Sequence, residues 1–200
     1  HSGSEHAWFQ EAVRYLQSLP EGETPDSRDC PYLDYYYFVP TEEAMGAYSV
    51  VTGTKYSYEA KFSYDMPDLN LGNAAVRNEI CDIMKFWLDK GVSGFRLDAA
   101  KEFYSGQVSK NVEVLSWLQK AATDIQPDAY LVAEVWEGFS TIADYYESGI
   151  TSIFNFAFGN ADGKITKVLQ GAGNESVVTT YATALEKADT AYRASNPNYI

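Results

Sequence analysis

Apolar side chains recur at every third or fourth position along several stretches of the C-terminal two thirds of the chain. This spacing places them on one face of a helix. It predicts four helices, at 73–91, 108–126, 141–148 and 175–194. The first is expected to be capped by Asn73 and to stop at Gly91. The second stops before Pro127, because the residue before a proline disfavours helical backbone.

Short apolar runs between these helices predict strands at 94–99, 130–136 and 151–158. Strands that alternate with amphipathic helices form a parallel sheet from βαβ units, which leaves a doubly wound sheet or a barrel. No predicted strand is followed by the glycine pattern that cradles phosphates in nucleotide-binding folds, so the barrel is favoured.

Residues 1–66 differ from the rest of the chain in composition. They are rich in Tyr, Pro, Gly and acidic residues with poor periodicity, and predict a loop-rich subdomain ahead of a barrel segment at 67–200.

Composition and charge exclude some classes of protein. The 200 residues are 46% hydrophobic, as in a globular domain or part of one. The net charge of −13 argues against a nucleic-acid partner, whose phosphates an acidic surface repels. No apolar run reaches the roughly 18 residues of a membrane span. Cys30 and Cys81 fit no metal or redox spacing, and a disulfide and two free thiols both stay open.

Two charges interrupt the predicted strand at 94–99. Arg96 and Asp98 are two positions apart, so they share one face of the strand. In a barrel this face is the interior, where an unpaired charge is costly, and we expect the two side chains to pair. The arginine would keep Asp98 ionised. Barrels carry their catalytic groups at this C-terminal end of the strands.

A third charge, Glu134, lies near the end of the next predicted strand, about one βα unit further along. Carboxyl groups on adjacent strand ends can lie about 5 Å apart, the separation typical of a retaining glycosidase. Asp98 would attack the sugar carbon, and Glu134, in drier surroundings and beside a like charge, would donate the proton. Spacing alone leaves open a structural Arg–Asp pair with an unrelated glutamate.

These residues lie in motifs that resemble the α-amylase family of glycoside hydrolases. "GFRLDAAKEF" at 94–103 resembles the family's fourth-strand motif, and "VAEVW" at 132–136 its fifth-strand motif. "MPDLN" at 66–70 resembles the motif that closes the family's inserted subdomain. The resemblance implies an α/β fold: part of a (β/α)8 TIM barrel, about strands 4–6, with a loop-rich subdomain inserted after the third strand.

The resemblance also implies that the chain is an internal fragment of a catalytic barrel. A complete barrel needs about 250 residues. The family's third essential aspartate, which follows an Asn-His pair, has no counterpart here. The remainder of the parent barrel is therefore an expected partner, and the isolated chain is expected to be inactive.

Roles follow from the resemblance position by position. Asp98 corresponds to the nucleophile, Glu134 to the general acid/base, and Arg96 to the arginine that orients the nucleophile. Lys101 corresponds to a residue that contacts sugars on the leaving-group side. His1 corresponds to the histidine that binds the sugar at the cleavage point.

Two further positions bear on the site. Trp136 follows Glu134 by two residues, so it shares that strand face and could line the cleft. Glu102 stands where many α-amylases have a histidine that makes a calcium contact. No metal ligand is therefore assigned in this chain, and the resemblance leaves Ca²⁺ open as a cofactor of the parent enzyme.

The leading hypothesis is a retaining hydrolase of α-1,4-linked glucans such as starch and maltooligosaccharides. Ala99 favours α-1,4 bonds, because members that prefer α-1,6 bonds tend to carry Val just after the nucleophile. Transfer of the glycosyl group to another sugar, an α-glucosidase activity and a non-catalytic relative that binds partners or carbohydrate are the alternatives. By analogy the enzyme is expected outside the cell or on its surface, with a cytoplasmic location left open.

Overall fold

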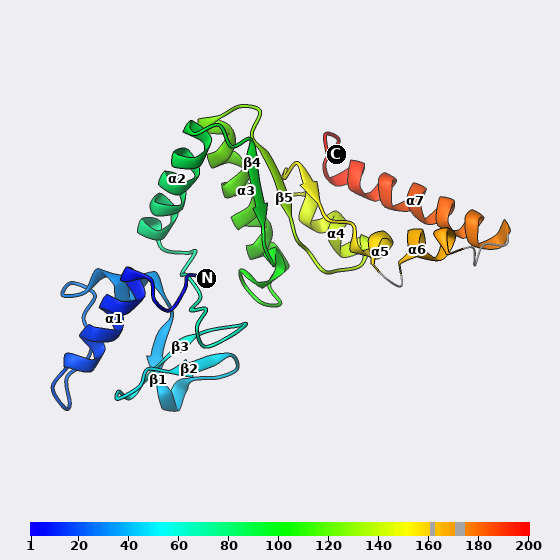
Figure 1. The fold of residues 1–200 in the computed structure, drawn as a ribbon. Coiled ribbons are helices and arrows are strands. Elements are labelled where there is room, and N and C mark those ends of the chain that lie inside the picture. The colour runs from blue at the N-terminus through cyan, green and yellow to red at the C-terminus, as the bar shows by residue number, and fades with distance from the viewer. Residues whose placement is uncertain (161–162, 171–174) are drawn as a thin grey trace. The chain divides into compact units, whose positions relative to one another are not determined.

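The computed structural model describes residues 1–160, 163–170 and 175–200 (Figure 1). The chain divides into two compact units, His1–Asp82 and Ile83–Ile200. The division falls within a single helix, α2 (Ala74–Asp89). The boundary expected after residue 66 stays a prediction.

The first unit contains more regular structure than the sequence predicted. It opens with helix α1 (Ala7–Ser18) and contains a three-stranded antiparallel sheet of order β1-β3-β2. Its strands are β1 (Phe38–Pro40), β2 (Tyr48–Val50) and β3 (Tyr56–Glu59). Strands of three or four residues are too short to show a clear alternation of apolar and polar positions, so periodicity did not reveal them.

Aromatic side chains fill the core of this first unit. Phe9 of α1 meets the rings of Tyr36 and Tyr58 edge to face, with centroids 5.2 and 4.7 Å apart. All three are buried, together with Leu16 and Val76. The bulk of a small irregular subdomain is thus supplied by a few large rings rather than by many aliphatic residues.

The second unit contains the predicted parallel sheet. Its strands, in the order β4-β5-β6, are β4 (Gly94–Leu97), β5 (Tyr130–Ala133) and β6 (Ser152–Ile153). Helix α3 (Val108–Ile125) connects the first two strands and α4 (Phe139–Tyr146) the last two. Figure 1 shows β4 and β5 side by side, as in a βαβ unit. The predicted α/β class and partial barrel are confirmed.

The third predicted strand was too long. The sequence predicted 151–158, but β6 ends at Ile153, and α5 (Phe156–Gly159) follows after two residues. Beyond the strand, Phe154 N–H still donates to the Ala133 carbonyl at 3.0 Å, and the ring of Phe156 stacks on Trp136. α6 (Lys164–Leu169) then leads to α7 (Glu175–Ser195).

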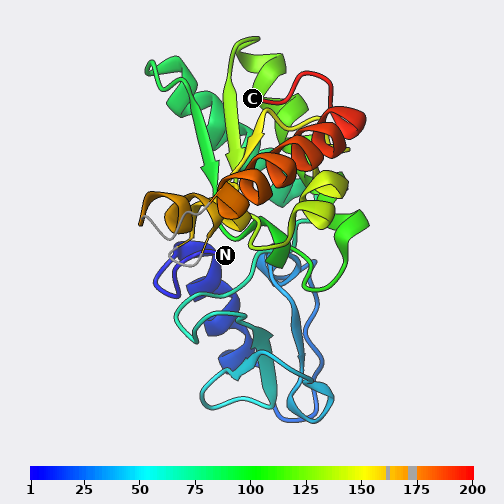
Figure 2. The same ribbon diagram turned by 90° about the vertical axis from the view of Figure 1, so that its right-hand side faces the viewer.

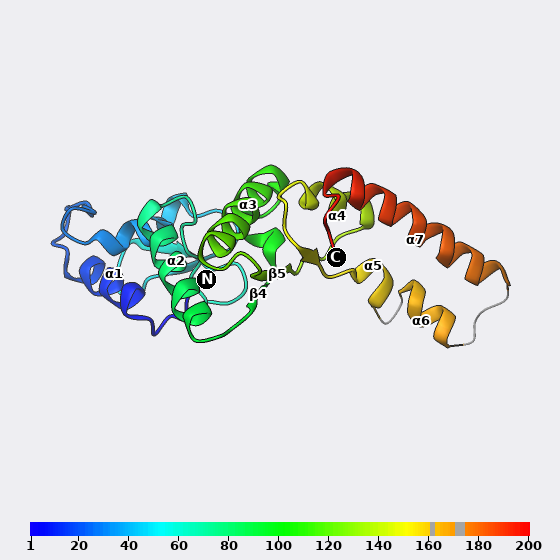
Figure 3. The same cartoon turned by 90° about the horizontal axis from the view of Figure 1, so that it is seen from above.

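Helix α7 packs along α4 at the C-terminal side of the second unit (Figure 2). The rings of Tyr146 on α4 and Tyr192 on α7 lie 5.0 Å apart. Seen from above, α6 lies beside α7 (Figure 3). The C-terminal residue lies next to the start of β6, because Ile200 N–H donates to the Thr151 carbonyl at 3.0 Å.

The start and stop signals of α2 are confirmed. The Asn73 side chain accepts from Ala75 N–H at 2.7 Å, and Gly91 follows the helix with a φ of 90°. Part of its apolar face is exposed, however: Ile83 and Trp87 are about half accessible.

Among the described residues, no helix is long and apolar enough to cross a membrane. Cys30 and Cys81 are free thiols.

Candidate active site

Asp98 and Glu134 leave the carboxyl ends of two adjacent parallel strands. Leu97, the last residue of β4, pairs with Ala133, the last residue of β5. Glu134 N–H donates to the Leu97 carbonyl at 2.9 Å, and Ala100 N–H donates to the Glu134 carbonyl at 2.8 Å. Backbone bonds therefore continue past both strands and hold the two acidic residues side by side.

Arg96 joins the two carboxylates. Its Nη2 donates to Asp98 Oδ1 at 2.7 Å and also contacts Glu134 Oε2. One guanidinium nitrogen thus reaches both acids, which places the acids next to each other. This arrangement brings together the two residues that the sequence predicts as nucleophile and proton donor.

The three charged side chains differ in their exposure to solvent. The Arg96 and Asp98 side chains are 52% and 57% exposed, whereas Glu134 is 15% exposed. The reason is that β4 is the edge strand of a three-stranded sheet, while Glu134 follows the central strand. The drier surroundings expected of Glu134 are nevertheless present.

Trp136 contacts Glu134 directly. Its Nε1–H donates to Glu134 Oε1 at 2.5 Å, and its indole stacks on Phe156 with centroids 4.1 Å apart at 23°. Phe154 lies nearby, with the Arg96 guanidinium 5.9 Å from its ring centre. The two phenylalanines were missed as site residues because the sequence placed them in a strand; their aromatic character was the available signal.

Lys101 reaches across to the segment that follows Glu134. Its Nζ donates to the Trp136 carbonyl and to Glu137 Oε1, both at 3.0 Å. The hydrogen bond that Lys101 donates to Glu137 raises the pKa of Lys101. The sequence reasoning did not single out Glu137, because a glutamate just after a strand carries no signal of its own.

A buried asparagine fixes the turn that carries Lys101. Asn111 on α3 is 1% exposed. Its Nδ2 donates to the carbonyls of Lys101 and Tyr104 at 2.7 and 3.2 Å, and its Oδ1 accepts from Tyr104 N–H at 2.8 Å. The Asn111 amide also lies 3.1 Å from the Tyr145 hydroxyl on α4.

The residue after the predicted nucleophile has an unusual backbone conformation. Ala99 has φ 43° and ψ 44°, and it is the one non-glycine residue with positive φ in the described chain. This left-handed conformation turns the chain sharply from β4 into the single turn Ala100–Glu102. Strained backbone of this kind is common at functional sites.

His1 belongs to the first unit. Its ring meets Phe62 edge to face, with centroids 6.0 Å apart. Its predicted contact with sugar stays a prediction.

The described residues contain no group of three His, Cys, Asp or Glu side chains placed to hold a metal ion. Glu102, which stands where many α-amylases have a histidine, accepts from the Ser105 hydroxyl at 2.5 Å. Among the described residues, Glu102 belongs to no such group.

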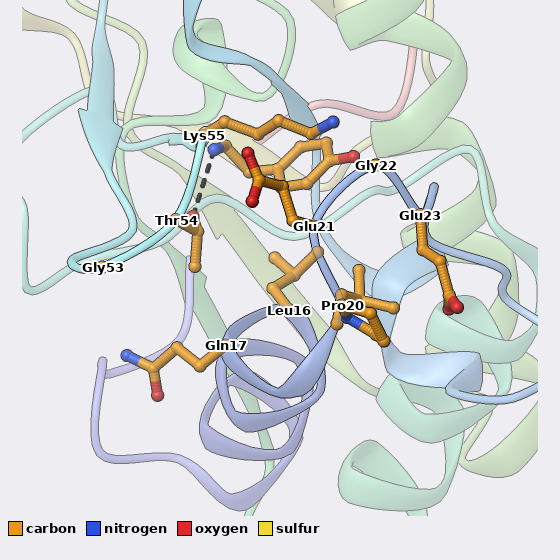
Figure 4. A pocket seen from close by; sticks show the side chains of 11 residues that line it. Leu16, Gln17, Pro20, Glu21, Gly22, Glu23, Gly53, Thr54 and Lys55 are labelled. Atoms are coloured by element: carbon orange, nitrogen blue, oxygen red, sulfur yellow. Dashed lines mark hydrogen bonds between the residues drawn. The ribbon is translucent and has the colours of Figure 1, made fainter.

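A separate hollow of about 630 Å³ lies in the first unit (Figure 4). The end of α1, the loop at 19–23 and the turn at 53–56 line it. Glu21, Glu23 and Lys55 contribute charged groups to its lining. None of the predicted site residues lines this hollow.

Comparison with known proteins agrees with this geometry. The family model described as "Alpha amylase, catalytic domain" matches residues 1–198. Alpha-amylase 3 of Dictyoglomus thermophilum is 37% identical over 178 residues, which cover 88% of this chain and 31% of that protein. An oligo-1,6-glucosidase of Parageobacillus thermoglucosidasius is 38% identical over 109 residues, 49% of this chain and 17% of that protein.

Solved structures show the same similarity. Eubacterium rectale Amy13B superposes with a TM-score of 0.93 at 43% identity, covering all of this chain and 38% of that one. The alpha-amylase from H. orenii gives a TM-score of 0.67 at 27% identity, again covering all of this chain and 39% of that one. The chain thus spans less than half the length of these relatives.

Proposed function

Because the chain belongs to the α-amylase family of glycoside hydrolases, we propose that the protein carrying it is a retaining hydrolase of α-1,4-linked glucans, such as starch and maltooligosaccharides. One observation carries the proposal: Arg96 joins the carboxylates of Asp98 and Glu134 at the ends of adjacent parallel strands. A pair of carboxyl groups flanking one bond is the essential requirement of glycoside hydrolysis.

The proposed reaction has two displacements. In the first, an Asp98 carboxylate oxygen bonds to the anomeric carbon, the bond to the leaving oxygen breaks, and Glu134 gives its proton to that oxygen. In the second, Glu134 takes a proton from water, the water oxygen bonds to the anomeric carbon, and Asp98 leaves as a carboxylate. Two inversions give a product with the configuration of the substrate.

The surroundings of the two acids support this division of roles. Glu134 is 15% exposed and Asp98 57% exposed. Glu134 therefore lies in the drier surroundings that suit a proton donor, and Asp98 in the more solvated surroundings that suit a nucleophile.

The proposed preference for α-1,4 bonds rests on Ala99, the residue after the nucleophile, and on the relatives named as alpha-amylases. Hydrolysis and transfer share the covalent intermediate, and only the molecule that enters the site separates them. A location outside the cell or on its surface stays a prediction.

A non-catalytic role as a binding relative is less favoured. Such a protein has no need of two carboxylates at the ends of adjacent strands, because it breaks no glycosidic bond. Here all three groups are present and in contact.

The proposal is tested with the full-length protein on maltooligosaccharides. Glu134→Gln removes the proton donor, and we expect kcat to fall by about a hundredfold to ten-thousandfold. Asp98→Asn removes the nucleophile and should abolish turnover. Matched controls are Glu147→Gln and Asp124→Asn, exposed residues that change charge equally. Wild-type activity in both site variants would refute the proposal.

A further inference from the structure

Residues 98–104 form the turn that leads from the end of β4 toward α3. Asn111, the fourth residue of α3, binds three backbone groups of this turn: the carbonyls of Lys101 and Tyr104 and the N–H of Tyr104. The mechanism proposed above does not use this amide. We infer that Asn111 is a positioning residue that holds Asp98 in place for its attack on the sugar. The inference rests on the proposed function.

The turn acts on Asp98 through the covalent chain. Ala99, the next residue, has φ 43° and ψ 44°. This conformation costs free energy for a residue with a Cβ, and it persists only where the surrounding structure enforces it. Glu102, between the residues that Asn111 binds, donates its N–H to the Ala99 carbonyl at 2.8 Å. If Asn111 released the turn, Ala99 could relax to an ordinary conformation and rotate Asp98 out of position.

The same turn is bonded to the second acid. Ala100 N–H donates to the Glu134 carbonyl at 2.8 Å. The turn is therefore fixed at two places, the end of β5 and the side chain of Asn111. A double displacement needs the two carboxyl groups at a defined separation. The bonds on both sides of the turn set this separation, because Asp98 is joined directly to it.

The Asn111 side chain is suited to hold a turn rather than to bind a ligand. It is 1% exposed, so a sugar cannot reach it. Its Nδ2 also lies 3.1 Å from the Tyr145 hydroxyl on α4, which fixes the amide from the other side. A buried polar group whose bonds are made is held rigidly. An apolar residue of the same size would leave the backbone groups of the turn without partners.

The test measures the chemistry of Asp98 in the full-length protein. A fluorinated α-maltosyl fluoride, whose glycosyl-enzyme forms faster than water removes it, provides two readouts. The labelling rate constant at saturation reports how well Asp98 attacks, and the final labelled fraction reports how many molecules are folded. For Asn111→Ser we expect the rate constant to fall about tenfold with most molecules still labelled, since a small misplacement of a reacting group is costly. Asn111→Asp keeps the shape but lacks the N–H donors, and should lose at least as much.

Asn196→Ser is the matched control. Asn196 is likewise a buried asparagine that binds backbone, at the Ile150 carbonyl and the Asn198 N–H, both at 3.0 Å, and neither bond reaches the turn. This variant should have a lower melting temperature and a labelling rate constant near wild type. Asn111 variants that are less stable but are labelled at the wild-type rate would overturn the inference. An equal fall of the rate constant in Asn196→Ser would overturn it too.

A second comparison separates an effect on Asp98 from an effect on Glu134. Fluoride departs without a proton donor, whereas cleavage of a maltooligosaccharide needs Glu134. Asn111→Ser should therefore lower kcat/KM on α-maltosyl fluoride and on a maltooligosaccharide by similar factors. A loss confined to the maltooligosaccharide would place the effect at Glu134 and overturn the inference. A wild-type protein that the reagent does not label would overturn the proposed function itself.

Discussion

At the scale of single residues, Arg96 explains how two acidic groups can lie next to each other. Both carboxylates contact its Nη2, so the guanidinium offsets the repulsion between them. A lysine would be a point charge on a flexible stem and could not present a planar set of donors. The site therefore depends on the residue type at position 96 as well as on the sign of its charge.

The backbone beside this site makes a first prediction. Ala99 has φ 43°, a region that β-branched residues avoid strongly. Ala99→Val should lower the free energy of unfolding by about 1–2 kcal/mol, while Ala99→Gly should leave it near wild type because glycine adopts this conformation freely. Urea unfolding of both variants checks this. Equal stability of the valine and glycine variants would show that the turn is not strained.

At the scale of elements, the register of β4 and β5 decides where Asp98 and Glu134 lie. The pairing runs from Gly94 opposite Tyr130 to Leu97 opposite Ala133. A slip of one residue would turn the carboxylates to opposite faces of the sheet. Glycine at position 94 permits this pairing, since a Cβ there would collide with the Tyr130 backbone.

This close approach gives a second prediction. Gly94→Ala should lower the free energy of unfolding by about 1–3 kcal/mol, the usual cost of overpacking, and should lower activity by moving β4 away from β5. Thermal unfolding and kcat on maltooligosaccharides measure the two effects. Gly138→Ala is the control, because a Cβ at that position has no neighbour within 4 Å. Equal behaviour of the two variants would contradict the account.

The elements also show what sequence can and cannot predict. The long helices α2 and α3 were predicted closely, because sixteen and eighteen residues repeat the helical period several times and carry clear end signals. The strands of the first unit were missed because three or four residues contain at most two repeats of the two-residue strand period. Asn111 was missed because helical periodicity counts apolar residues, and a buried amide that binds a turn has no such signature.

The sequence predicted only those residues of the candidate site that place a charge within an apolar strand. Arg96, Asp98 and Glu134 were found because charge within an apolar run is unusual. Glu137 and Phe156 were not, because their significance comes from what they contact: Lys101 in one case and Trp136 in the other. These contacts join residues that are 20 or more positions apart in the chain, so a pattern within one segment does not reveal them.

At the scale of the whole molecule, the chain consists of two units that each bury their own core. In the second unit, α4, α7 and the C-terminal residues meet in a group of three tyrosines, at 146, 192 and 199. This group connects the last helix and the chain end to α4, the helix that follows strand β5.

The tyrosines predict a loss of stability at alkaline pH. Burial raises the pKa of Tyr146 to about 12, and burial with a hydrogen bond to Asp189 raises that of Tyr199 to about 12. Unfolded tyrosine ionises near pH 10. Stability is therefore complete below pH 10 and falls as the pH rises toward 12, by on the order of 2 kcal/mol for Tyr146.

Thermal unfolding of the full-length protein between pH 8 and pH 12 tests this. Tyr146→Phe should be less stable at pH 8, because Ile153 N–H loses its acceptor, yet should show a shallower decline above pH 10. Parallel curves for the variant and the wild type would show that Tyr146 does not contribute to the decline.

The most direct test of the central claim is to trap the covalent intermediate. A fluorinated α-maltosyl fluoride that forms the glycosyl-enzyme faster than water removes it is mixed with the full-length protein, and the peptides are mapped by mass spectrometry. We expect one added fluorinated maltosyl group, formed with loss of the anomeric fluoride, attached to Asp98 and absent in Asp98→Asn. A sugar ester on another residue, or turnover with inverted configuration and no ester, would contradict it.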